Sequence, residues 1–131
     1  MEELATLLKH MNLFAHNAHN LAKGPLFLQD HAFLSDLYEA YDGHYDSVVE
    51  RIIGLGQPCN LKQIAVLAAS HLEEVGDNKA ALSHLYKMEN ELCSHIEELA
   101  KSGVSQGTLN LLADLADKSE QRQYLLSRRI K

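Results

Sequence analysis

The sequence is poor in the residues that mark small secreted domains and membrane proteins. Its 131 residues include two cysteines, two prolines and no tryptophan. Cys59 and Cys93 lack CxxC spacing, and two cysteines in a chain of this length do not make a disulfide framework. We therefore expect ordinary thiols in a cytoplasmic protein. No apolar run approaches the ~20 residues of a membrane helix, and the acidic start MEELATLLKHM does not resemble a secretory signal.

An excess of positive charge is also missing. The formal net charge is -6, which argues against a protein drawn to nucleic acid by its overall charge and mildly favours attraction of cations. We expect the first helix to start almost at Met1, with no lysine-rich tail before it. Hydrophobic residues make up 46% of the chain, enough for a folded globule with a real core. We expect a single domain over residues 1–131.

Apolar residues recur at three- and four-residue spacing along most of the chain, which predicts helices. Four long helices are expected over residues 1–22, 26–53, 77–101 and from Ser105 or Thr108 to the end. A short helix from Asn60 to about residue 69 falls in the connection between the second and third. No strand pattern or internal repeat is present. The expected fold is all-α: a ferritin-like four-helix bundle with a long crossover connection.

The second long helix has two seams. The first repeats at four- and three-residue spacing, as in a bundle core, and consists of Leu34, Tyr38, Tyr41, Tyr45, Val48 and Ile52. The second seam is mixed, and its apolar members are Leu28, Ala32, Val49 and Ile53. Two seams on one helix indicate that one faces the chain's own bundle and the other a neighbouring subunit.

The mixed seam also carries side chains that bind metals. One side of the helix, within an arc of roughly 100°, holds His31, Asp42, Asp46 and Glu50. Charged groups on a face that packs need a partner, because burying an unpaired charge is costly. The partner is either a bound metal ion or a web of ion pairs.

The case for metal binding is weaker at the remaining histidines. His16 and His19 lie three residues apart and so share one side of the first helix, where hydrogen-bonded histidines are more common than ligands. His44 should point away from the mixed seam, and three further histidines show no ligand spacing: His71, His84 and His95. All four are expected to be surface or structural residues. The basic end SRRIK suits the negative end of a helix dipole, with a DNA contact as the alternative.

Several residues at fixed spacing match a known family. His19 precedes the turn Lys23-Gly24-Pro25-x-Phe27, and His31 follows twelve residues after His19. Further on stands Asp46-x-x-x-Glu50-Arg51. This pattern resembles the Dps family, the mini-ferritins or DNA-binding proteins from starved cells. The resemblance extends more loosely over nearly the whole chain.

The resemblance implies a hollow shell of twelve identical subunits. Its ferroxidase site would lie between two subunits related by a two-fold axis, with His19 and His31 from one and Asp46 and Glu50 from the other. Asp42 and Asp36 are further candidate ligands, although Asp42 also suits a salt bridge or hydrogen bond at the interface. Iron would be oxidised from Fe(II) to Fe(III), preferably by hydrogen peroxide or else by oxygen, and stored inside the shell. Mixed nitrogen and oxygen ligands suit Fe(II), and the histidines must be neutral to bind it.

The sequence departs from the family at two positions near that site. Ser35 stands where the family usually has an Asp, and Asn20 replaces its Trp. Asp36 is rotated about 100° from Ser35 around the helix and is not an easy substitute. The alternative reading is a shell with an impaired ferroxidase site, acting as a weak iron store or as a structural or DNA-protecting protein. Asp114 and Asp117 either line a cation pore of the shell or belong to a solvated face.

Overall fold

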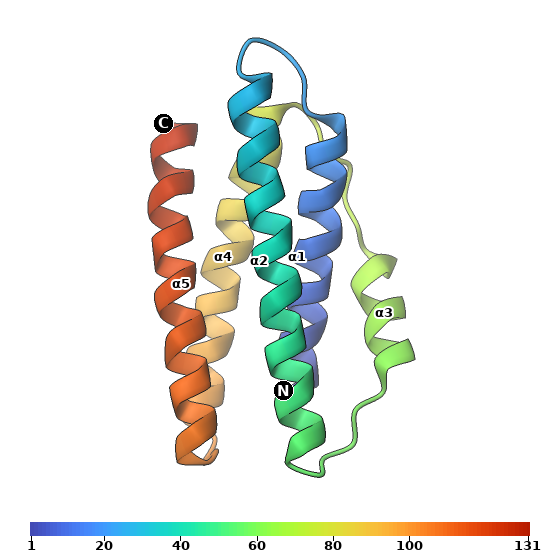
Figure 1. Ribbon diagram of the computed structural model, residues 1–131, viewed down its shortest axis with the longest axis vertical. Helices are drawn as coiled ribbons and strands as arrows, with labels where there is room; N and C mark the ends of the chain where they lie inside the picture. Colours follow the sequence, from blue (N-terminus) through green and yellow to red (C-terminus); the bar gives the residue numbers. More distant parts are fainter. The chain divides into compact units, whose positions relative to one another are not determined.

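The computed structural model describes all residues 1–131 and contains five helices and no strand (Figure 1). The helices are α1 (Glu2–Leu21), α2 (Phe27–Gly54), α3 (Leu61–Ser70), α4 (Asn78–Ala100) and α5 (Gln106–Ile130). The prediction of four long helices, with a short one in the connection between the second and third, is confirmed. None of the five helices is both long and apolar enough to cross a membrane.

Side-chain caps set where three of the helices begin. The Asn60 side chain accepts a hydrogen bond from the Gln63 amide at 3.0 Å, before α3. The Asp77 carboxylate accepts one from the Ala80 amide at 2.8 Å, before α4. The Ser105 hydroxyl accepts one from an amide in the first turn of α5. Such bonds satisfy amides that have no partner within the helix, and they settle the start of α5 in favour of Ser105.

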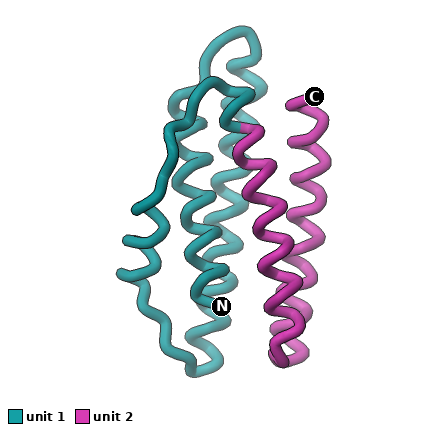
Figure 2. Tube along the Cα trace, turned by 180° about the vertical axis from the view of Figure 1, so that it is seen from behind, with its two compact units in different colours: residues 1–81 teal, residues 82–131 magenta.

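Residues 1–81 form the first of two compact units (Figure 2). Within this unit, α1 packs against both α2 and α3. The buried apolar side chains of α1 and α2 include Leu4, Leu8, Met11, Phe14, Leu34, Tyr41, Val48 and Ile52. Tyr38 and Tyr45, which the apolar seam predicted to be core residues, are only half-buried. The short helix α3 contributes Ile64 and Ala68 to the core.

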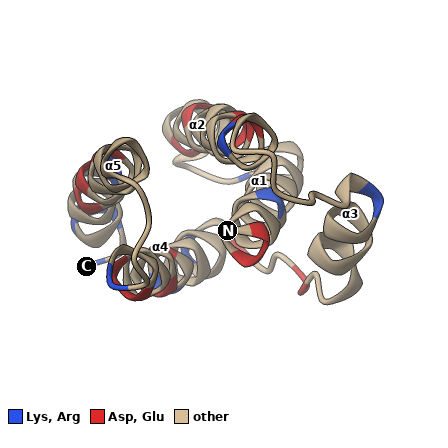
Figure 3. Cartoon of the chain, turned by 90° about the horizontal axis from the view of Figure 1, so that it is seen from below, with Lys and Arg blue, Asp and Glu red and all other residues tan.

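Charge is unevenly distributed over the helices of the first unit (Figure 3). The only charged residue of α3 is Lys62. Several apolar side chains of α3 are exposed, among them Leu61, Val66 and Leu67. In contrast, α2 carries a series of acidic side chains. The outer face of α3 is therefore apolar and that of α2 is mixed.

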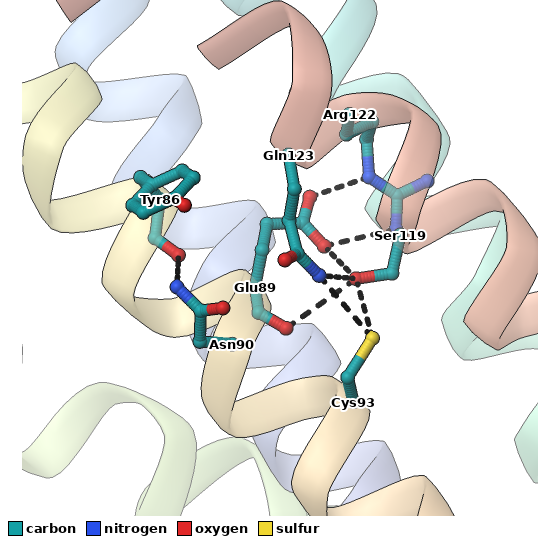
Figure 4. A network of polar contacts seen from close by, with 7 residues as sticks. All are labelled: Tyr86, Glu89, Asn90, Cys93, Ser119, Arg122 and Gln123. Atoms are coloured by element: carbon teal, nitrogen blue, oxygen red, sulfur yellow. Dashed lines mark hydrogen bonds and ion pairs between the residues drawn. The ribbon is translucent and has the colours of Figure 1, made fainter. Parts of the chain in front are cut away.

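Residues 82–131 form the second unit, in which a buried ion pair joins α4 to α5 (Figure 4). The Glu89 side chain is fully buried, and Arg122 is 8% exposed. The Arg122 guanidinium donates two hydrogen bonds to the Glu89 carboxylate, and the Ser119 hydroxyl donates a third at 2.7 Å. Cys93 is a half-buried free thiol that donates to the Ser119 hydroxyl. The prediction of a single domain over residues 1–131 stays a prediction.

Candidate metal centre

The turn between α1 and α2 brings His19 and His31 together. Gly24 has a φ of 92°, a conformation that glycine adopts without a steric penalty. The chain reverses there, so the end of α1 lies beside the start of α2 (Figure 1). The two imidazole rings stack with their centroids 3.7 Å apart and their planes 19° from parallel. The sequence alone placed these residues on separate helices, and the turn makes them neighbours.

Each imidazole also bonds to the backbone of the other residue. His19 Nδ1 lies 2.8 Å from the His31 carbonyl oxygen, and His31 Nδ1 lies 3.0 Å from the His19 carbonyl oxygen. A carbonyl oxygen only accepts hydrogen bonds, so each Nδ1 carries the proton. In the neutral ring the lone pair then belongs to Nε2. This is the arrangement in which a histidine binds a metal ion, with its other nitrogen oriented by a backbone carbonyl.

Three more rings surround this pair. Phe27 stacks on His31 with a centroid distance of 4.8 Å. Tyr38 meets the edge of His19 at 5.3 Å and stacks on His16 at 4.1 Å. His16 is exposed, and its ring is 6.2 Å from that of His19. The sequence predicted that His16 and His19 share a helix side, but it did not predict the contacts of Phe27 and Tyr38 with the pair.

The predicted carboxylate ligands lie elsewhere on α2. Asp46 and Glu50 are exposed and one helical turn apart. Asp46 is fifteen residues beyond His31, which is roughly 22 Å along the helix axis. Asp42 and Asp36 are exposed as well. Within one chain, no group of three or more His, Cys, Asp or Glu side chains is placed to hold a metal ion.

The mixed seam of α2 is exposed along most of its length. Leu28 is 77% exposed and Ile53 is 55% exposed, and these residues stand at the two ends of the seam. Val49 is the exception and is buried. Ser35, one turn beyond His31, is half-buried. The seam thus combines apolar side chains, three carboxylates and His31 on a face of α2 that is mostly exposed in the single chain.

Burial and the negative charges of nearby α2 carboxylates both affect the pKa of Tyr45. Burial raises the pKa of its phenol above the ordinary value, and the negative charges of Cys59, Asp46 and Asp42 raise it further. The Lys9 ammonium group lies 5.0 Å from the centre of the Tyr45 ring, a distance at which a cation is attracted to the ring face. Tyr45 is therefore a neutral phenol at physiological pH.

The other residues considered from the sequence lie on surfaces or within helices. His71 is exposed, whereas His44, His84 and His95 are half-buried. On α5, Asp114 pairs with Lys118 at 3.0 Å, and Asp117 accepts a hydrogen bond from Gln121 at 3.0 Å. Both carboxylates are exposed. In the chain itself they belong to a solvated face.

Comparison with known proteins identifies the family. The model of the ferritin-like domain matches residues 2–131, so the chain belongs to the ferritin-like family. A solved structure of a point mutant of Mycobacterium smegmatis Dps1 is similar over 99% of this chain and 91% of its own, with a TM-score of 0.81 and 19% sequence identity. No curated protein matches the chain significantly. The chain has the fold of a Dps-type mini-ferritin, and the predicted four-helix bundle with a short extra helix is confirmed.

Proposed function

We propose that this protein is an iron-storing mini-ferritin that oxidises Fe(II). The observation that carries the proposal is the reciprocal bonding of His19 and His31, which leaves the Nε2 lone pair of each of two stacked rings available. Hydrogen peroxide is the preferred oxidant, with oxygen as the alternative, and the ferric product is stored in a hollow shell of twelve subunits. The chain acts in the cytoplasm, and residues 1–131 form one domain.

The metal site is completed by a second copy of the chain. The His19–His31 pair of one subunit faces Asp46 and Glu50 of its partner across a two-fold axis. Two exposed apolar residues on the same face of α2, Leu28 and Ile53, support the packing of that face against another copy. Burial of such side chains is favourable at about 25 cal/mol per Å². A two-fold axis repeats the same contact twice, so each pair of subunits holds two such sites.

The residues of the chain have distinct roles in this reaction. The His19 and His31 Nε2 atoms and the partner carboxylates bind Fe(II), the substrate, through a mixed nitrogen and oxygen set that suits this ion. Hydrogen peroxide takes up two electrons, one from each of two Fe(II) ions, and two protons yield two water molecules. Ser35 offers only a hydroxyl where a carboxylate would strengthen the second iron position. The second iron is therefore held more weakly than the first.

The second candidate function is a shell whose ferroxidase site is impaired. The half-buried Ser35 hydroxyl favours it, because a neutral oxygen holds Fe(II) less well than a carboxylate. Such a shell would store iron weakly or serve a structural or DNA-protecting role. The net charge of -6 does not favour direct DNA binding. The two candidates differ in whether the protein accelerates Fe(II) oxidation.

Mixing two inactive variants tests whether the site is shared. His31→Ala removes a ligand from one side, and Glu50→Ala removes one from the other. Each variant alone should lose rapid Fe(II) oxidation. When the two are unfolded together and refolded, each mixed dimer regains one intact site, and part of the activity should return. No recovery from mixed dimers that do form, or full activity in either single variant, would overturn this assignment.

A further inference from the structure

Asn78, the first residue of α4, is bonded to the turn that joins α1 and α2. Its side-chain oxygen accepts a hydrogen bond from the Lys23 amide at 3.1 Å. Its side-chain nitrogen donates to the Lys23 carbonyl oxygen at 2.7 Å and to Asp30 Oδ2 at 3.0 Å. The amide of Asn78 thus uses its acceptor and both of its donor hydrogens on residues that are 48 to 55 positions away in the sequence.

Asp30 is the buried end of this contact. It is 1% exposed, and it lies in the first turn of α2, where the helix dipole favours a negative charge. A buried carboxylate is costly unless its oxygens are hydrogen-bonded, so the Asn78 amide stabilises Asp30 in this position. His31 is the next residue along the chain. The clamp, which we define as Asn78 with Lys23 and Asp30, therefore holds the backbone on either side of the turn.

The geometry points to Asn78 and Asp30 as positioning residues of the metal centre, an inference that rests on the proposed function. The two reciprocal bonds of the histidine pair each join a ring on one helix to a carbonyl on the other. An increase of about 1 Å in the separation of α1 and α2 at this point would stretch both bonds beyond normal hydrogen-bond length. The clamp fixes the two sides of the same turn relative to each other, because Asn78 bonds both to Lys23, just after α1, and to Asp30, in the first turn of α2.

Phe27 is a second link between the clamp and the orientation of the His31 ring. It follows the clamped Lys23 by four residues and stacks on the face of His31. His31 is thus held between the Phe27 and His19 rings. Residues that orient metal ligands without touching the metal change affinity by about 10- to 100-fold when removed. Neither Asn78 nor Asp30 was among the candidate site residues that the sequence predicted.

Cobalt binding to the assembled protein measures this effect, because the visible absorption of Co(II) reports its ligands. Asn78→Ala removes every bond of the clamp from the α4 side. The matched control is Asn90→Ala on the same helix, since the exposed Asn90 amide donates only to the Tyr86 carbonyl one turn before it. The Kd for Co(II) should rise about 10- to 100-fold in Asn78→Ala and stay unchanged in Asn90→Ala.

A second variant keeps the test decisive if Asn78→Ala folds poorly. Asn78→Asp retains an acceptor for the Lys23 amide but places a carboxylate against Asp30, so it should bind Co(II) at least as weakly as Asn78→Ala. Adding Asp30→Asn to Asn78→Asp restores a donor and an acceptor between the two side chains. This double variant should recover most of the affinity, and a double variant no better than Asn78→Asp would contradict the inference.

The protonation of the imidazole nitrogens gives a readout that needs no metal. In ¹⁵N solid-state NMR spectra, wild-type His19 and His31 should carry their proton on Nδ1, and Asn78→Ala should shift part of the population to Nε2. Wild-type spectra and wild-type Co(II) affinity in Asn78→Ala would overturn the positioning role. Failure of the proposed function looks different, because wild-type protein would then not accelerate Fe(II) oxidation. In that case the spectra still decide whether Asn78 orients the pair.

Discussion

His19 and His31 each donate their Nδ1 hydrogen to the backbone carbonyl oxygen of the other. Two residues twelve positions apart are thereby locked in one tautomer and stacked at 3.7 Å. The histidine pair is therefore formed by contacts within a single chain. Pre-organisation of this kind lowers the entropy lost on binding.

The reciprocal bonds predict that the two histidines act as a unit. His19→Ala removes one ligand and also one hydrogen bond that orients the other ring, and His31→Ala does the same in reverse. The free-energy losses of the single variants should therefore sum to more than the loss in the double variant, by about 0.5–3 kcal/mol. Co(II) titration of the three variants checks this, with His71→Ala as a surface control. Strictly additive losses would show that the rings bind independently.

Ser35→Asp should accelerate Fe(II) oxidation at the proposed metal site. Ser35 lies one turn beyond His31 on α2 and is half-buried, so a carboxylate there would supply a ligand of the kind that holds Fe(II) well. We expect the rate of Fe(II) oxidation by hydrogen peroxide to rise about tenfold, equal to about 1.4 kcal/mol of barrier.

Ser47→Asp is the matched control for this gain. Ser47 is exposed on the same helix, and its hydroxyl bonds only to the Gly43 carbonyl one turn before it. The added charge is the same in both variants, so any general attraction of Fe(II) cancels. Equal rates in Ser35→Asp, Ser47→Asp and wild type would mean that position 35 does not face the iron.

Local patterns in the sequence were enough to predict the helices and their starts. The short helix was predicted to start at Asn60 and the third long helix at residue 77, and in both places a side chain bonds to the amide three residues on, a contact that neighbouring residues decide. The heptad-like spacing of apolar residues likewise identified the long helices. The histidine pair was found through the turn Lys23-Gly24-Pro25, whose spacing resembles that of the Dps family.

Contacts between distant segments could not be predicted in this way. Asn78 bonds to residues 48 to 55 positions away, and nothing in its own neighbourhood indicates that partner. Glu89 did leave a signal, because it stands four residues after Leu85 and three before Leu92, on the buried stripe of α4. A charged residue on such a stripe requires a buried partner, and only the structure shows that the partner is Arg122.

Removal of Arg122 should be strongly destabilising. Arg122→Met leaves the buried Glu89 carboxylate without its cation, and loss of one partner of a buried pair costs about 3–5 kcal/mol. Chemical denaturation should show this as a lower free energy of unfolding. Lys118→Met on the same helix is the control, since its pair with Asp114 is exposed and contributes about 0–1 kcal/mol. Similar losses in both variants would contradict the account of the buried pair.

Cys59 should be a slow nucleophile although it is only half-buried. Burial raises the pKa of its thiol above the ordinary value, and the charge of Glu2 raises it further. The thiolate is the reactive form, so at a given pH the fraction that reacts is small and it grows as pH rises. Glu2→Gln should lower that pKa and speed the reaction with a disulfide reagent in a Cys93→Ser background. Glu3→Gln, at an exposed neighbour, should leave the rate unchanged, and equal rates in the two variants would exclude the role of Glu2.

The oxidation of Fe(II) by hydrogen peroxide, with and without the protein, tests the central claim most directly. The same sample is then separated by size to find which species holds the iron. The account predicts that the protein accelerates oxidation and that the ferric product elutes with a large assembly of this chain. Oxidation at the protein-free rate, with iron lost as a precipitate, would contradict the proposed ferroxidase and leave a ferritin-like fold without iron chemistry.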